Sequence, residues 1–152
     1  MLGLVASNGK AMKPAWFPTG YRLTAKDYVK ILASKVLPWI QSIVGNSPWG
    51  FQQDGAPAHA SKKAQEWLKD NMSFWPKEYW PPQSPDLNPL DFPSRRTWRP
   101  RPAKKRHKNI NALKADVNKA WASMDADYIQ QVCGSFRRRL TSAIESNGGY
   151  ID

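Results

Sequence analysis

Residues 52–59 read QQDGAPAH and residues 80–92 read WPPQSPDLNPLDF, and these two stretches decide the fold of the chain. The first completes a short apolar run that begins at Trp49 and is typical of a brief strand. Because Gly55 permits a sharp turn, we expect the carboxylate of Asp54 to project at the edge of a sheet. Taken alone, an Asp before a Gly is better explained as a turn former than as a functional residue.

Asp91 stands in a different local setting. Asn88 is a favourable N-cap and Pro89 is a favourable first helical residue, so the sequence predicts a helix whose first turn contains Asp91. An acid in that position also complements the helix dipole, which is a purely structural role. Asp54 and Asp91 are 37 positions apart (91 − 54), and as a pair they are more informative than either acid alone.

The segments before residue 52 predict a hairpin followed by a long helix. Two apolar runs, 2–6 and 12–17, surround the turn-like sequence Ser7-Asn8-Gly9-Lys10, a pattern typical of a β-hairpin. Thr24 opens a capping-box-like helix start. The helical spacing of apolar residues behind it continues past a kink that we expect at Pro38.

Beyond these segments the pattern becomes mainly helical. A helix is predicted to end at about Asp70, and residues 72–75 are predicted as a brief strand. Two apolar stripes, from Ile110 to Met124 and from Ile129 to Ile144, predict two C-terminal helices whose apolar faces form core or helix-pair contacts. The order of strands and helices indicates an α/β fold in which a sheet is covered by helices.

Together, the two stretches resemble the central and C-terminal parts of the catalytic core of Tc1/mariner-type DNA transposases, members of the DDE/DDD superfamily. The spacing of Asp54 and Asp91 is similar to that in the superfamily. The resemblance implies a ribonuclease-H-like fold and, as activity, metal-dependent DNA cleavage and strand transfer at transposon ends. Further segments of family-like sequence are Val5–Lys10, Leu37–Ile40, Lys108–Asn111 and Gly149–Ile151.

The resemblance also implies a set of site residues. In the family three carboxylates hold two Mg²⁺ or Mn²⁺ ions, which activate the attacking water or 3′-hydroxyl and stabilise the leaving oxygen. By this resemblance Asp54 is the second catalytic and metal-binding carboxylate, and Asp91 is the third. Asp86 competes for the third place, although its position inside a turn favours a structural role. His59 is expected to pack beside the site, with direct catalysis the less favoured interpretation.

The first departure from the family pattern concerns the first carboxylate. It has no counterpart between Met1 and Gln53, where the one acid, Asp27, falls in the first turn of a predicted helix. The chain is therefore interpreted as truncated at the N-terminus, with an incomplete ribonuclease-H-like fold that lacks the first central strand. The helix-turn-helix module by which the family recognises transposon ends is also not found. We expect such a fragment to be inactive alone.

The second departure is the sequence of residues 93–106. Pro93 stands four residues after Pro89 and cannot continue the predicted helix, because it lacks the N–H and clashes with the carbonyl one turn earlier. A pair of compensating frameshifts or a mis-spliced exon edge would produce such a foreign stretch between intact flanks. The expected organisation is a partial transposase core at 1–92, an aberrant basic segment at 93–107 and the C-terminal helical part of the same domain at 108–152.

The basic segment also supports an alternative function, that of a DNA-binding or interaction protein derived from a transposase remnant. Residues 93–108 carry eight basic residues and no acid, and without them the net charge falls from +11 to +3. Such clusters bind phosphates without sequence preference and resemble nuclear localisation patches, although a solvated loop is an equally favoured interpretation. The candidate nucleic-acid-binding residues are Arg95, Arg96, Arg99, Arg101, Lys104, Lys105 and Arg106.

Composition excludes several classes of protein. Cys133 is the one cysteine, so an internal disulfide is impossible and a secreted scaffold is disfavoured. We expect no membrane partner, because no apolar stretch approaches the ~20 residues of a membrane span. With only His59 and His107 beside that cysteine, we expect no zinc site. The expected partners are DNA, as transposon ends in the family, and a second copy or an intact transposase subunit, and the expected location is the nucleus.

Overall fold

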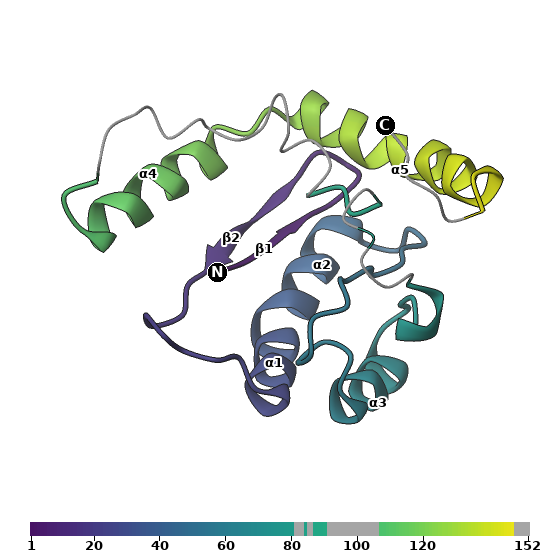
Figure 1. The fold of residues 1–152 in the computed structure, drawn as a ribbon, viewed down its shortest axis with the longest axis horizontal. Coiled ribbons are helices and arrows are strands. Elements are labelled where there is room, and N and C mark those ends of the chain that lie inside the picture. The colour runs from purple at the N-terminus through teal and green to yellow at the C-terminus, as the bar shows by residue number, and fades with distance from the viewer. Residues whose placement is uncertain (81–83, 85–86, 91–106, 148–152) are drawn as a thin grey trace. The chain divides into compact units, whose positions relative to one another are not determined.

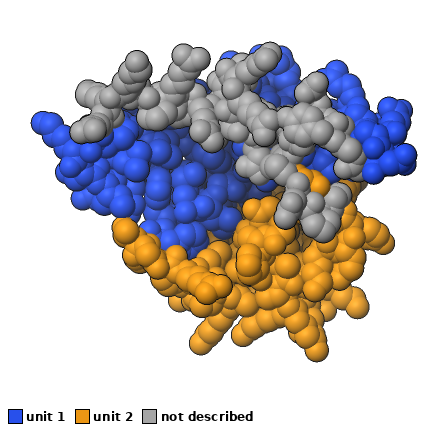
Figure 2. All heavy atoms as spheres, viewed as in Figure 1, with its two compact units in different colours: residues 1–17, 85–152 blue, residues 18–84 orange. Residues whose placement is uncertain are grey.

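The computed structural model describes residues 1–80, 84, 87–90 and 107–147 (Figure 1). The chain divides into two compact units, one formed by residues 1–17 with 85–152 and the other by residues 18–84 (Figure 2). The expected boundary at residue 93 falls outside the described residues.

The first unit contains the predicted hairpin. Strand β1 (Leu2–Val5) pairs antiparallel with β2 (Ala11–Ala15), and Leu4 lies opposite Met12. The turn between them needs Gly9, whose φ of +88° lies in the left-handed region that favours glycine. The Asn-Gly signal in the sequence therefore identified this hairpin correctly.

Two C-terminal helices complete the first unit, as predicted. Helix α4 (Ile110–Ala122) begins at the N-cap Asn109, and α5 (Ala126–Glu145) begins at the N-cap Asp125. Each cap side chain accepts a hydrogen bond from a backbone N–H of the first turn, which satisfies a donor that has no partner within the helix. Helix α4 packs on β2 (Figure 1).

Trp121 joins α4 to the hairpin. Its side chain is buried, and its indole N–H donates to the backbone carbonyl of Met12 at 2.8 Å. The ring lies so close to Gly3 that a Cβ added there would come within 2.4 Å of a ring carbon. The core of this unit therefore forms where Trp121, Met12 and Ile129 are buried next to the two strands.

The two apolar stripes are only partly buried, which corrects the prediction that they form core or helix-pair contacts along their length. Ile110, Leu113 and Ile144 are exposed, at 47%, 40% and 68%. The physical reason is size, since a two-stranded hairpin covers only a short part of a helix of 20 residues such as α5. Helical spacing identifies an apolar face correctly but does not show how much of that face a neighbour covers.

The second unit begins with a helix that changes its winding. Helix α1 (Ala25–Ile31) is capped by Thr24, as predicted, and passes through a π-helical turn (Leu32–Val36) into α2 (Leu37–Val44). Pro38 lies at the start of α2, but the residues before it are helical too, so its missing N–H interrupts the hydrogen bonds of a continuous helix. The sequence predicts a kink at Pro38, and the structure has a π-helical turn immediately before it.

Helix α3 (Lys62–Asn71) packs beside α1 in this unit (Figure 1). The hydroxyl of Ser61 caps α3 by accepting from the N–H of Ala64, and the α3 face that contains Ala64 and Leu68 is fully buried. On α1 and the turn after it, Tyr28 and Leu32 are fully buried. These apolar faces explain why the two helices lie together.

The two strands predicted near residues 49–52 and 72–75 do not form. They are reduced to a single parallel bridge between Phe51 and Phe74, held by backbone bonds of 2.8 and 3.0 Å on either side of Phe51. Pro48 and Pro76 flank the bridge and cannot donate to a ladder. Among the described residues the sheet content is therefore one hairpin and one bridge, which is consistent with the expected incomplete α/β fold.

The segment that precedes Asp91 is described only as far as Leu90. The side chain of Asn88 accepts from the N–H of Leu90 at 3.2 Å, so Asn88 does act on the backbone that follows it. The helix predicted to start at Pro89 lies mostly outside the described residues. Within the described ranges, no helix combines the length and the apolar character needed to cross a membrane.

Candidate active site around Asp54

Asp54 lies in the loop that follows the Phe51 bridge, and half of its side chain is exposed (50%). Its Oδ1 accepts a hydrogen bond of 3.1 Å from the N–H of Ala56, two residues later. This is the turn-forming geometry that an Asp before a Gly predicts. The same bond fixes one carboxylate oxygen close to the backbone.

His59 makes the second bond to Asp54. Its Nδ1 lies 2.6 Å from the same Oδ1. The pKa of Asp54 is lowered, first by this bond from His59 and then by the bond from Ala56, although partial burial opposes the shift. Since the carboxylate is ionised at neutral pH and can only accept, Nδ1 carries the hydrogen and donates it. The expectation that His59 packs beside the site is confirmed.

Tyr28 supports the imidazole from the other side. The two rings are stacked with centroids 4.1 Å apart, and the Tyr28 hydroxyl donates to Oε1 of Gln53 at 2.5 Å. Burial, together with the negative charge of Asp54, raises the pKa of Tyr28 well above its ordinary value, so the phenol remains a donor. Sequence reasoning missed Tyr28 as a site residue, because its helical spacing identifies only a core aromatic.

Two glutamine side chains hold the backbone of His59. The amide groups of Gln53 and Gln65 both donate to the His59 carbonyl, at 3.2 and 2.9 Å. Gln65 also accepts from the N–H of Lys77 at 3.1 Å, which ties α3 to the segment after it. His59 is thus held at its ring and at its carbonyl.

The second carboxylate oxygen of Asp54 is left available. Both bonds fall on Oδ1, and no residue in the described part of the chain donates to Oδ2. An ionised, half-exposed carboxylate is the kind of ligand that Mg²⁺ and Mn²⁺ prefer. Within the described ranges, however, no three His, Cys, Asp or Glu side chains gather closely enough to hold a metal ion.

The other predicted site residues lie elsewhere or are not described. Asp91, Asp86 and the seven basic residues between Arg95 and Arg106 fall outside the described residues. Nδ1 of His107 lies 3.3 Å from a carboxylate oxygen of Asp116, and both residues belong to the unit that does not contain Asp54. Cys133 is half-buried, and burial raises the pKa of its thiol, in keeping with a small apolar role.

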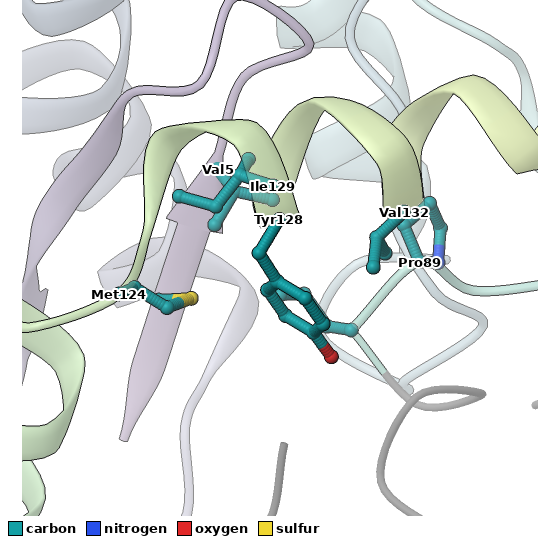
Figure 3. A pocket seen from close by; sticks show the side chains of 7 residues that line it. Val5, Pro89, Met124, Tyr128, Ile129 and Val132 are labelled. Carbon is teal, nitrogen blue, oxygen red and sulfur yellow. The ribbon is translucent and has the colours of Figure 1, made fainter. Parts of the chain in front are cut away.

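A small apolar pocket lies in the first unit, where the beginning of α5 faces β1. Val5, Met124 and Tyr128 are among the residues that line it (Figure 3). Its volume of about 10 Å³ holds at most a single water molecule. This pocket is therefore a packing defect, and Asp54 remains the candidate site.

Comparison with known proteins supports the resemblance that was based on the sequence around Asp54. No protein-family model matches the chain. The Tcb1 transposase of Caenorhabditis briggsae is 33% identical over 124 residues, which cover 80% of this chain and 43% of that protein. The Tc1 transposase of Caenorhabditis elegans is 31% identical over 126 residues, with the same shares. The chain is a sequence relative of the Tc1-type transposases.

Solved structures identify the fold of the chain. The Mos1 transposase catalytic domain, solved with Mg, matches 99% of this chain and 75% of that chain, with a TM-score of 0.77 and 18% identity. The Mos1 paired-end complex with a left transposon end matches 95% of this chain and 42% of that chain, with a TM-score of 0.77 and 20% identity. These likenesses confirm the ribonuclease-H-like fold. The chain spans less than half the length of its curated Tc1-type relatives.

Proposed function

We propose that this chain supplies part of a transposase active site for metal-dependent DNA cleavage and strand transfer, with Asp54 as one of the metal-holding carboxylates. The observation that carries the proposal is the state of Asp54: it is ionised, its Oδ1 is fixed by two donors, and its Oδ2 receives none from the described residues. Mos1 catalytic-domain structures solved with Mg and with Mn support a divalent cation as cofactor.

Each residue has a separate part in this proposal. Asp54 would bind Mg²⁺ or Mn²⁺ through Oδ2, and Asp91 is proposed as a further ligand. When bound, the ions would activate the attacking water or 3′-hydroxyl and stabilise the leaving oxygen. Asp54 is suited to this because it is already ionised and needs no deprotonation before a cation binds.

The proposed substrate is DNA at transposon ends, and the proposed location is the nucleus. The Mos1 complex with a transposon end supports the first of these.

We propose that the chain alone binds metal weakly and does not cleave DNA. In the described residues, Asp54 is not part of any group of three acidic, histidine or cysteine side chains that could hold a metal ion. A second copy or an intact transposase subunit would be the partner that completes the site. The proposed organisation of the chain is a partial transposase core at 1–92, a basic segment at 93–107 and a C-terminal helical part at 108–152.

Mn²⁺ titration of the full chain tests the proposal, with the EPR signal of free Mn²⁺ as readout. Asp54→Asn keeps the shape of the side chain but removes its charge, and we expect it to abolish binding. Asp70→Asn is the matched control, since it removes an exposed acid from α3 in the same unit. Equal binding by the chain and by Asp54→Asn would refute the role of Asp54. If the chain nicks supercoiled DNA and Asp54→Asn does not, the role of Asp54 would be supported, but the proposal that the chain is inactive alone would be refuted.

A DNA-binding remnant is the second candidate function, favoured by the eight basic residues within 93–108. Deleting residues 95–108 and measuring binding to a short duplex separates the two functions. Binding that survives Asp54→Ala but is lost in the deletion would favour the remnant. Binding that survives the deletion would exclude the basic segment as its source.

A further inference from the structure

His59 is a buried polar residue at an otherwise exposed site. The residue is 8% exposed, whereas the Asp54 side chain that it contacts is 50% exposed. Burying a polar ring costs free energy unless its polar atoms are bonded, and Nδ1 meets this need by donating to Asp54 Oδ1. The ring is therefore built into the fold, while the carboxylate at its edge faces solvent.

The imidazole is held from several directions. Tyr28 is stacked on its face, and the Tyr28 hydroxyl is fixed by Gln53. Gln53 in turn donates to the His59 carbonyl, as Gln65 does from α3. The two glutamines therefore fix the backbone of His59, while Tyr28 and Asp54 contact its imidazole. Together these contacts restrict rotation of the imidazole away from Asp54.

We propose that His59 is a positioning residue that locks the carboxylate of Asp54 so that Oδ2 faces the divalent cation. This inference rests on the proposed function of Asp54. With only the bond from the Ala56 N–H, a half-exposed carboxylate in a loop would have more rotational freedom, and fixing it beforehand removes that entropic cost from metal binding. His59 Nδ1 is itself not a ligand, because it carries the hydrogen that it donates to Asp54.

Two substitutions distinguish positioning from general packing. In His59→Asn the amide nitrogen occupies the same place along the side chain as Nδ1, so the donor to Asp54 is retained. In His59→Gln the donor lies one bond farther out. Both variants lose the stack on Tyr28, so each is the other's control for stability. The measurement is the Kd for Mn²⁺, with melting temperatures recorded alongside.

We expect His59→Asn to bind Mn²⁺ within about threefold of the unsubstituted chain, and His59→Gln to bind about 10- to 100-fold more weakly, the usual effect of losing a group that orients a metal ligand. Equal affinity in the two variants at similar melting temperatures would overturn the inference. If both unfold, Tyr28→Phe keeps the stack but removes the bond to Gln53. That variant should weaken binding severalfold, and an unchanged Kd would count against the inference.

A metal-free readout separates this inference from the proposed function. Three-bond nitrogen–carbon couplings report the χ1 rotamer of Asp54 in the absence of any cation. We expect couplings typical of a single Asp54 rotamer in the unsubstituted chain and in His59→Asn, and couplings averaged over several rotamers in His59→Gln. This result would support positioning even if Mn²⁺ binding did not depend on Asp54. Averaged couplings in the unsubstituted chain would refute it, whatever the metal affinity.

Discussion

The hydrogen bond from His59 Nδ1 to Asp54 Oδ1, with a length of 2.6 Å, is the largest cause of the lowered pKa of Asp54. The motif at residues 52–59 was sufficient to identify Asp54 and to place His59 beside it, because five positions of chain keep the two close. Tyr28 could not be found in this way. Its partner Gln53 lies 25 positions later, and only the packing of α1 against α3 brings Tyr28 to the site.

The lowered pKa of Asp54 predicts an acid-sensitive contribution to stability in metal-free buffer. Since the folded-state pKa lies below the unfolded value of about 3.9, protonation favours the unfolded chain. The contribution is complete above that value and is lost as pH falls through the folded pKa. In urea unfolding, the chain should exceed Asp54→Asn in stability at pH 7, and the difference should shrink towards pH 3. A difference independent of pH would contradict this assignment.

Helices were predicted better than strands because the information for a helix is local. The cap at Thr24 and the apolar spacing that predicted the two C-terminal helices are properties of residues close together in the sequence. A strand needs a partner from elsewhere in the chain. The apolar runs at Phe51 and Phe74 therefore look like strands in the sequence, although in the described structure they share only one bridge.

Two glycine substitutions should change the first unit in opposite directions. Gly3→Ala would place a Cβ 2.4 Å from the Trp121 ring, and we expect a loss of about 1–3 kcal/mol through overpacking. Gly134→Ala meets no atom within 4 Å on helix α5 and should gain up to about 1 kcal/mol in helix propensity. Urea unfolding of the full chain measures both. A neutral Gly3→Ala would show that the contact of β1 with Trp121 is not tight.

The whole chain combines a transposase fold with an unusual distribution of charge. It matches 75% of the Mos1 catalytic domain and spans less than half the length of its curated relatives. Most of the net charge of +11 lies in residues 93–108. Sequence showed this concentration directly, because charge counts need no three-dimensional information. The groups that lie beside Asp54 could be identified only from the fold.

The basic segment predicts a salt dependence of DNA binding. Replacing the seven basic residues from Arg95 to Arg106 by Gln should reduce the slope of log K against log salt by up to about 6, since each phosphate contact contributes about 0.9. Replacing Arg137, Arg138 and Arg139 on α5 is the control, and we expect a smaller change. Titrations of a short duplex at several salt concentrations provide the slopes. A larger effect of the α5 variant would locate the DNA contact on that helix instead.

The central claim is that Asp54 holds a divalent cation, and residue-resolved NMR of the full chain during Mn²⁺ addition tests it most directly. Bound Mn²⁺ broadens the signals of nearby nuclei, so we predict selective broadening at Asp54, Gly55 and Ala56. The broadening should be lost in Asp54→Asn and kept in Asp70→Asn. Broadening that is centred on other acids, or that persists unchanged in Asp54→Asn, would contradict the account.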